Sequence, residues 1–178
     1  MNTRQATIYC AASERIDPKY NQAARQLARA LHQRGYTLVS GGGKVGTMGA
    51  ITDESVRCGG RHIAVLPRFM EGLENPAVSQ VLWTDTMAER KEKMREGSSV
   101  AIALPGGIGT LDELMETHVL RKLGRFTGPV LALNLDGFYD PLIALLDHYV
   151  ATGATTRADA DLLQFPRTVE ELLALLDA

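Results

Sequence analysis

Short apolar runs alternate along this chain with longer stretches in which apolar positions recur every third or fourth residue. The short runs are typical of buried strands, and the longer stretches of helices that bury one face. The runs predict strands over residues 6–10, 37–40, 62–66, 81–84, 99–104 and 129–134, with a candidate edge strand at 163–165. The periodic stretches predict helices over residues 18–34, 48–58, 87–97, 111–123 and 140–150, a short helix near residue 159 and a last helix from about 169.

Capping residues support several of these helix starts. Thr86 and Thr168 are each followed by a glutamate three residues later, which is the pattern of a capping box. Asp140 precedes Pro141, so we expect an aspartate N-cap followed by proline at the first helical position. Residues 68–79 show no clear period and predict a loop or a ragged helical turn, which is a candidate lid.

The alternation of strands and helices favours one α/β domain spanning residues 1–178, with a parallel sheet covered by helices on both faces. Ligands of such sheets bind beyond the carboxyl ends of the strands. We therefore look for the functional site among the loops that follow the strands.

Two predicted strands end in glycine-rich turns that lead directly into helices. We call residues 40–47 (SGGGKVGT) the first glycine loop and residues 105–110 (PGGIGT) the second glycine loop. Glycine lets the backbone approach a ligand closely, and a helix N-terminus adds free N–H groups and a positive dipole end. Both loops therefore predict phosphate sites facing one crevice, and two such sites in a small domain suggest a nucleotide.

The pattern Gly41-x-Gly43-x-x-Gly46 also matches the fingerprint of NAD-type dinucleotide-binding proteins. That fingerprint normally follows the first strand and has an acidic residue about 20 positions later. Here it follows the second predicted strand, and the third strand ends in Leu-Pro-Arg at residues 66–68. We therefore give the dinucleotide interpretation less weight, and the absence of GxxxxGK[ST] from the sequence excludes a P-loop.

The composition indicates an ordinary globular protein. The 178 residues are 45% hydrophobic and 22% charged, with a formal net charge of −2 and dispersed basic residues, so we expect no nucleic-acid partner. Cys10 and Cys58 form neither a disulfide framework nor a metal-ligand spacing. Without a signal peptide or a long apolar stretch, we expect a soluble cytoplasmic protein with no membrane partner, no metal and no cofactor.

Three motifs occur in order: SGGGKVGTMGA from residue 40, TMAERKEKM from residue 86 and PGGIGTLDE from residue 105. Together they closely resemble the LOG family of nucleotide phosphoribohydrolases, which are often labelled lysine decarboxylases, and the resemblance extends from the first strand to residues 136–141. It implies a Rossmann-like domain, usually a homodimer, that hydrolyses the N-glycosidic bond of purine nucleoside 5′-monophosphates. The products are the free base, a cytokinin or adenine, and ribose 5-phosphate.

Carried onto this sequence, the resemblance makes Glu113 the catalytic carboxylate and Arg90 its essential basic partner. It implies that the nucleotide is bound by Ser13, Gly41, Gly42, Gly43, Gly46, Thr47, Met87, Lys91, Gly106, Gly107, Ile108, Gly109, Thr110, Leu111 and Asp112. The chain departs from the family pattern at residues 11–12, where Ala-Ala replaces Gly-Ser, and at residues 119–122, where Val-Leu-Arg-Lys replaces Thr-Trp-Ala-Gln.

The chemistry suits these residue types, because breaking the bond from ribose C1′ to a purine nitrogen builds positive charge on the sugar. A carboxylate beside C1′ can stabilise that charge, attack it or activate water. Other interpretations remain open. Glu113 could cap its helix together with Thr110, and Arg90 and Lys91 could be ordinary surface charges. Glu74 could reach the site from the lid loop.

Two other functions remain open, and the homodimer that the resemblance implies has weak support from the sequence. The chain could bind or sense a nucleotide without turnover, and the decarboxylase label would require pyridoxal phosphate held on a lysine. For the homodimer, apolar side chains crowd the predicted catalytic helix at Leu114, Met115, Val119 and Leu120, although they could equally face the sheet.

Overall fold

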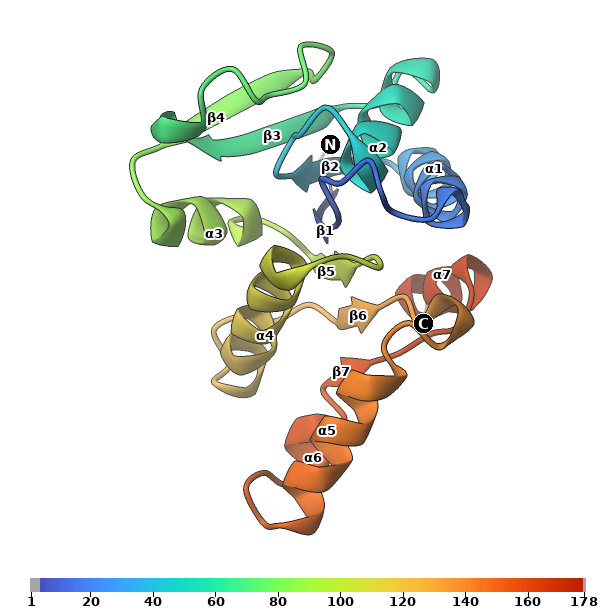
Figure 1. Cartoon of the computed structure of the whole chain (residues 1–178), viewed down its shortest axis with the longest axis vertical. Helices are drawn as coiled ribbons and strands as arrows, with labels where there is room; N and C mark the ends of the chain where they lie inside the picture. Colours follow the sequence, from blue (N-terminus) through green and yellow to red (C-terminus); the bar gives the residue numbers. More distant parts are fainter. Residues whose placement is uncertain (1–3, 178) are drawn as a thin grey trace.

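A seven-stranded parallel sheet runs through the middle of the molecule (Figure 1). The structure, a computed structural model, describes residues 4–177. The strand order is β4-β3-β2-β1-β5-β6-β7, and every neighbouring pair is parallel. The strands are β1 (Arg4–Tyr9), β2 (Tyr36–Ser40), β3 (His62–Pro67), β4 (Gln80–Thr84), β5 (Val100–Ala103), β6 (Val130–Ala132) and β7 (Leu163–Gln164). The predicted parallel sheet and its edge strand are confirmed.

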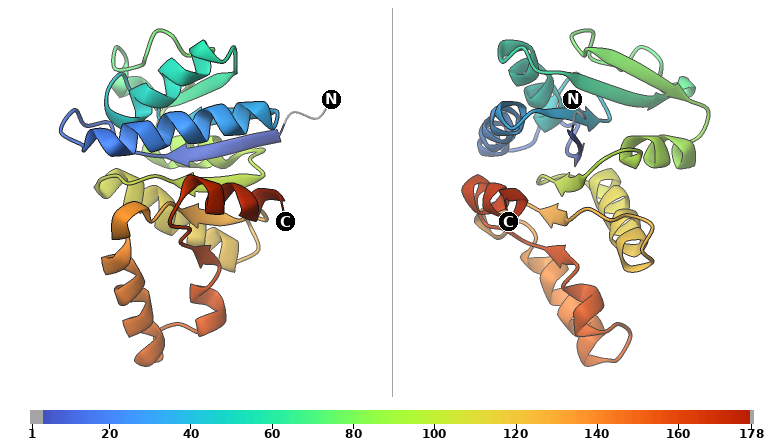
Figure 2. Two further views of the ribbon diagram at one scale, coloured as in Figure 1. Left: turned by 90° about the vertical axis from the view of Figure 1, so that its right-hand side faces the viewer. Right: turned by 180° about the vertical axis from the view of Figure 1, so that it is seen from behind.

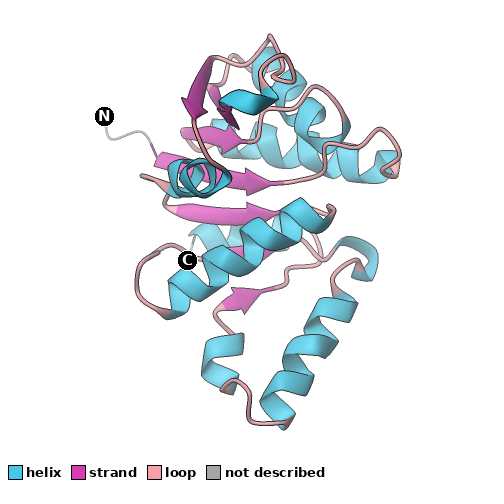
Figure 3. Ribbon diagram, turned by 60° about the vertical axis from the view of Figure 1, so that its left-hand side comes forward, coloured by secondary structure: helices cyan, strands magenta, loops and turns pink. Residues whose placement is uncertain are grey.

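Helices cover both faces of this sheet, as the alternating pattern predicted (Figure 3). One face packs against α1 (Pro18–Gln33), α2 (Gly46–Arg57) and α7 (Val169–Asp177), and α1 and α7 lie side by side there (Figure 2). The other face packs against α3 (Met87–Arg95), α4 (Ile108–Lys122) and α5 (Asp140–Ala151). The short elements are η1 (Arg68–Met70), η2 (Leu135–Gly137) and α6 (Arg157–Ala160).

The central strands are apolar on both faces because each face lies under helices. Every residue of β2 and β5 is buried, and the two hydrophobic clusters lie on opposite sides of the sheet. Such strands read as continuous apolar runs rather than as an alternating pattern, which is why the sequence predicted them well. By contrast, α5 and α6 extend beyond the sheet at the lower end of Figure 1, and α5 buries Leu146 as its contribution to the core.

The strand order reverses at β1, which pairs with β2 on one side and with β5 on the other. A crevice opens beyond the carboxyl ends of the strands at such a point, because the following helices leave toward opposite faces. The loop after β1, the first glycine loop after β2 and the second glycine loop after β5 therefore meet at one edge.

Three helix starts differ from the sequence-based prediction, and the first is that of α2, which begins at Gly46 rather than at residue 48. Helix α4 begins at Ile108 rather than at residue 111, with Gly107 as N-cap. Thr110 is thus already the third helical residue, and the capping box of Thr110 with Glu113 is wrong. The N-cap of α5 is Tyr139 rather than Asp140, which is already the first helical residue, and the Asp140 carboxylate accepts a hydrogen bond from Asn134 Nδ2 at 2.8 Å.

The remaining predicted caps are confirmed. Thr86 forms a complete capping box with Glu89 at the start of α3. Thr168 accepts a hydrogen bond from the backbone N–H of Glu171 at the start of α7. Within residues 4–177, no helix is long and apolar enough to cross a membrane.

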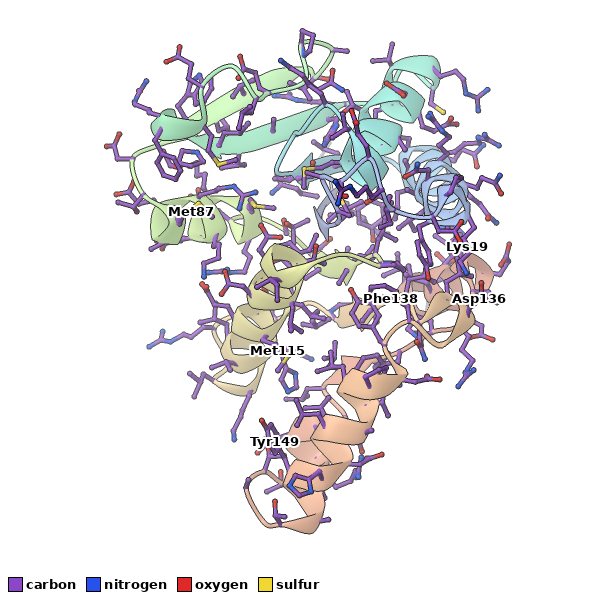
Figure 4. The ribbon with its side chains drawn as sticks, in the orientation of Figure 1. Lys19, Met87, Met115, Asp136, Phe138 and Tyr149 are labelled. Carbon is purple, nitrogen blue, oxygen red and sulfur yellow. The ribbon has the colours of Figure 1, made fainter. Side chains whose placement is uncertain are left out.

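An ion pair and an aromatic contact join the start of α1 to the turn after β6 (Figure 4). Lys19 Nζ lies 3.0 Å from Asp136 Oδ2, and the ring of Tyr20 meets that of Phe138 edge-on. Asp136 has a φ of 53°, a left-handed conformation that few residues other than glycine adopt. This contact links the two halves of the sheet at the edge where the ligand loops meet.

Candidate active site

A buried ion pair stands at the carboxyl edge of the sheet, made by the two residues expected to do the chemistry. Arg90 Nη1 on α3 donates to Glu113 Oε1 on α4 at 2.7 Å. Arg90 is 7% exposed and Glu113 is 5% exposed. A capping glutamate would lie in the first turn, whereas Glu113 is the sixth residue of its helix. The structure therefore gives this carboxylate a buried cation as its partner and no capping role.

Backbone contacts hold the Arg90 guanidinium in one place. Its Nε donates to the carbonyl of Val65 at 3.0 Å. Val65 is the β3 residue just beyond the pairing of β2 with β3, which ends at Ser40 opposite Ala64, so its carbonyl is left for Arg90. A Cβ at Gly41 would lie 2.4 Å from Arg90 Nη2, so only glycine leaves room for the guanidinium there.

Two features of the environment of Glu113 shift the pKa of its carboxyl group in opposite directions. Burial raises the pKa of the Glu113 carboxyl, and the adjacent Arg90 charge opposes that rise, with the net result above the ordinary value. The backbone carbonyl of Glu113 accepts from Thr117 Oγ1 at 2.8 Å. Tyr9 OH, whose pKa burial raises to about 12, in turn donates to Thr117 Oγ1 at 2.8 Å. The helix segment that carries the carboxylate is thus tied to β1.

The second glycine loop presents an open helix N-terminus. Gly107, Ile108 and Gly109 are exposed, and no side chain of the described part of the chain hydrogen-bonds as a cap to α4. The first N–H groups of a helix have no acceptor within it, so they are available to an anion. Tyr139 OH supports the loop from below by donating to the Leu104 carbonyl at 2.7 Å.

Tight packing fixes the shape of this loop. A Cβ at Gly106 would lie 2.2 Å from Thr110 Oγ1, so the buried Thr110 side chain packs directly under the glycine. Only glycine at position 106 leaves room for the Thr110 side chain in this position.

The first glycine loop, in contrast, uses much of its hydrogen-bonding capacity internally. The Gly42 N–H donates to Ser40 Oγ at 3.1 Å, and the Gly43 N–H points at Met48 Sδ at 3.1 Å. The Gly42 carbonyl accepts from the Asn75 N–H at 2.7 Å. Both loops were expected to face one crevice as phosphate sites, and in the first loop the Gly42 and Gly43 N–H groups already have partners within the loop and at the start of α2.

The start of α2 is capped by the loop after β1. Thr47 Oγ1 and the Met48 N–H both donate to the Ala11 carbonyl at 3.1 Å, and Thr47 is fully buried. A Cβ at Gly46 would lie 2.7 Å from the Ser13 nitrogen, so Gly46 permits this close contact. Ser13 itself is exposed beside it. Thr47 and Gly46 therefore shape the site, and Ser13 lies at its surface.

Lys91 is engaged by carboxylates of the neighbouring helix. Its Nζ lies 3.0 Å from Asp112 Oδ2 and also contacts Glu116, which is shared with Arg95 Nη2 at 2.6 Å. The hydrogen bond that Lys91 donates to Glu116, reinforced by the one it donates to Asp112, raises the pKa of Lys91. These ion pairs tie α3 to α4. They occupy Lys91 and Asp112, both of which were expected to bind the nucleotide.

Three of the expected binding residues are exposed apolar side chains. Met87 begins α3, and Ile108 and Leu111 lie in the first turn of α4, with Ile108 85% exposed. Figure 4 shows Met87 and Met115 on the side of the molecule formed by these two helices. The mouth of the site thus combines polar backbone with apolar side chains.

The loop over residues 68–79 is held down on the first glycine loop. Gly43 and Glu74 form an isolated antiparallel bridge, and Lys44 Nζ donates to the Gly72 carbonyl at 2.6 Å. The Glu74 carboxylate accepts from the Gly72 N–H at 2.7 Å. Glu74 therefore stabilises its own loop, and the structure gives it no contact with Glu113.

Four residues that support the site were not predicted from the sequence: Tyr9, Val65, Thr117 and Tyr139. A carbonyl or hydroxyl that braces a site leaves no local pattern, because its partner lies on a distant element. The DGFYDP turn at residues 136–141 was the one available signal for Tyr139. Across residues 4–177, no group of three or more His, Cys, Asp or Glu side chains is placed to hold a metal ion.

The chain resembles known proteins in sequence over almost its full length. Residues 48–176 match the profile of a family described as possible lysine decarboxylase. The chain is 37% identical to the cytokinin riboside 5′-monophosphate phosphoribohydrolase LOG2 of Arabidopsis thaliana, covering 98% of this chain and 83% of the relative. It is also 37% identical to the LOG protein of Oryza sativa subsp. japonica, covering 98% and 73% respectively.

Solved structures with the same fold have more distant sequences. The molybdenum cofactor binding protein of Rippkaea orientalis superposes with a TM-score of 0.77 at 24% identity, over 99% of this chain and 97% of that one. The molybdenum cofactor carrier protein of Chlamydomonas reinhardtii gives 0.74 at 19% identity, over 98% and 96%. At these identities the likeness concerns the fold alone. The family follows from the sequence matches and the motifs, and this chain belongs to the LOG family.

Proposed function

We propose that this protein hydrolyses the N-glycosidic bond of purine nucleoside 5′-monophosphates to free base and ribose 5-phosphate. The observation that carries the proposal is the buried ion pair between Arg90 of α3 and Glu113 of α4, the helix whose N-terminus lies in the second glycine loop. Glu113 lies five residues beyond Ile108, about 8 Å along a helix that rises 1.5 Å per residue. A phosphate at the N-terminus would therefore leave the sugar near the carboxylate.

In this proposal each group has a defined task. The backbone N–H groups of the second glycine loop bind the 5′-phosphate, which fixes the ribose and makes the reaction effectively unimolecular. Glu113 stabilises the positive charge that develops at C1′ as the bond to the base breaks. Water supplies the oxygen that bonds to C1′, and the base leaves with the electron pair and takes up a proton. Arg90 keeps the Glu113 carboxylate ionised and oriented.

The exposed apolar side chains at the mouth support contact with the base. Met87 and Leu111 lie at the starts of the two helices that carry Arg90 and Glu113. Apolar side chains suit the face of a purine or an apolar substituent on it. The named relatives act on cytokinin riboside 5′-monophosphates. We therefore propose AMP and isopentenyladenosine monophosphate as the two substrates to compare.

The test is to incubate the purified protein with each monophosphate and with adenosine, and to measure the released base by chromatography. We expect release from the monophosphates and far poorer release from adenosine, because the phosphate contacts position the ribose. Equal turnover of adenosine and AMP would contradict the role given to the second glycine loop. Saturable nucleotide binding without any released base would identify a binding or sensing module instead.

The description of the family as a possible lysine decarboxylase can be tested on the same preparation. A lysine that forms a Schiff base usually has a lowered pKa, whereas the pKa of Lys91 is raised by its hydrogen bonds to Glu116 and Asp112. We expect no aldimine absorbance in the purified protein and no loss of base release after borohydride treatment. Inactivation by borohydride would favour the decarboxylase interpretation.

We also propose that the protein is a homodimer joined through the outer surface of α3, α4 and α5. Of the four residues suggested by the sequence, Leu114 is fully buried and Met115 and Leu120 pack against the core, while Val119 is 49% exposed. A seventh exposed apolar side chain, that of Leu123, is at the C-cap of α4, and six lie on the three helices: Met87, Ile108, Leu111, Val119, Leu145 and Tyr149. Exposed apolar side chains on helices that cover the same side of the sheet support an interaction surface there. Light scattering should give about twice 19.3 kDa, and the monomer mass would refute the dimer.

A further inference from the structure

A chain of hydrogen bonds runs through the core beneath α2 and ends on the first glycine loop. His62 on β3 lies 3.1 Å from Thr52 Oγ1 through Nδ1 and 2.8 Å from Ser40 Oγ through Nε2. Ser40 Oγ also accepts from the Gly42 N–H at 3.1 Å. The three side chains are buried to 1% exposure or less. A polar network at this depth is stable only if all its members are satisfied.

One arrangement of protons satisfies every member of the chain. Thr52 Oγ1 donates to the Met48 carbonyl at 3.4 Å, so it accepts from His62 Nδ1–H. Nε2 is then unprotonated and accepts from the Ser40 hydroxyl, which leaves Ser40 Oγ free to accept from Gly42. This arrangement requires a neutral imidazole. Burial lowers the pKa of His62 to about 4, which agrees with a neutral ring.

These hydrogen bonds hold the first glycine loop, which is also the loop that confines the Arg90 guanidinium. Gly42 adopts a φ of 67°, and the neighbouring Gly41 passes so close to Arg90 Nη2 that a Cβ there would lie 2.4 Å from it. Arg90 in turn holds the Glu113 carboxylate at 2.7 Å. A shift of the loop would therefore move the guanidinium and, with it, the carboxylate.

We propose that His62 is a positioning residue of the active site, acting through Ser40 to set the first glycine loop and thereby the place of Arg90. His62 touches neither the substrate nor Glu113 in this proposal. The effect on catalysis rests on the proposed function, whereas the effect on the loop does not.

A matched pair of serines provides the test. Ser40 and Ser55 are both buried, and each contacts a histidine Nε2 at 2.8 Å, His62 for Ser40 and His32 for Ser55. Ser55 lies on α2, and its hydroxyl donates to the Ile51 carbonyl rather than serving the loop. Ser40→Ala and Ser55→Ala thus remove equivalent hydroxyls, and only the first removes the acceptor of Gly42 N–H.

Hydrogen exchange in the peptide covering residues 36–47 is measured together with steady-state kinetics on AMP. We expect Ser40→Ala to speed exchange of the loop amides and to lower kcat by about tenfold or more, since small misplacements at a site are costly, with KM changed less. Ser55→Ala should lose a comparable amount of thermal stability, but it should neither speed exchange of the loop amides nor lower kcat. His62→Gln, which keeps an acceptor for Ser40, should retain more kcat than His62→Leu.

Equal behaviour of Ser40→Ala and Ser55→Ala in exchange and in kcat would overturn the proposal. If the wild-type protein releases no base, the proposed function fails, and the exchange comparison still decides whether the network sets the loop. Unchanged loop exchange in Ser40→Ala would then overturn the inference by itself.

Discussion

Replacing Glu113 with glutamine tests the assignment of the catalytic carboxylate most directly. Glutamine keeps the size of the side chain and one acceptor oxygen, but it removes the negative charge 2.7 Å from Arg90 Nη1. Because Glu113 is not a capping residue, the helix start should be unaffected. The perturbation therefore acts on the buried pair and on the chemistry.

The structure sets the expected loss of stability. Removing one partner of a buried ion pair costs about 3–5 kcal/mol, because the other charge stays buried without compensation. Glutamine retains a neutral hydrogen bond to the guanidinium, so a smaller loss of about 1–3 kcal/mol in the free energy of unfolding is expected. Chemical denaturation of both proteins measures this difference.

The same substitution should also cause a large loss of catalytic rate. A neutral amide cannot stabilise the positive sugar, so base release from AMP should fall by about 100-fold or more, which corresponds to about 2.7 kcal/mol at 1.36 kcal/mol per tenfold. Product is measured by chromatography at saturating AMP and under conditions where both proteins are folded.

Glu116→Gln is the matched control. Glu116 lies on the same helix and also pairs with α3, through Lys91 and Arg95, but it is 32% exposed on its side chain and does not touch Arg90. We expect this variant to change base release by less than about threefold, because Glu116 is half-buried and touches neither Arg90 nor Glu113. Near-normal base release by Glu113→Gln would mean that the chemistry belongs to another group.

Three further predictions concern stability, pH and assembly. Gly42→Ala should lower the free energy of unfolding by more than about 2 kcal/mol, because φ is 67° and the new Cβ would lie 2.1 Å from Ala64 Cβ; Gly35→Ala, with φ of 79° and open space, should cost less in the same denaturation assay. The pKa of His62 is about 4 in the folded protein, below its value of about 6.5 in the unfolded chain. The free energy of unfolding should therefore be unaffected by the protonation of His62 above about pH 6.5 and should fall by up to about 3 kcal/mol as pH falls toward 4. His62→Gln should flatten this part of the pH–stability curve, and an unchanged curve would contradict the assignment. Val119→Glu places a charge on the proposed dimer surface and should give the monomer mass in light scattering with an unchanged core; a persistent dimer would move the interface elsewhere.

Local features of the sequence determined the elements and their order. Strands such as β5 are covered on both faces, so their apolar runs are visible without any knowledge of their neighbours. Glycine loops between a strand and a helix marked the functional edge, because parallel strands all end there. The motifs around Arg90 and Glu113 identified the family because each motif is a contiguous run of residues, which the sequence shows directly.

Tertiary structure alone decided which of these groups is available to a ligand. The first and second glycine loops look alike in sequence, but Asn75 of the loop over residues 68–79 packs on the first and donates its N–H to the Gly42 carbonyl. Glu113 had a plausible partner three residues away in Thr110, and the structure pairs it instead with Arg90 from another helix. A hydrogen-bonding group shows in sequence what it can bind, but its partner is chosen by packing between elements distant along the chain.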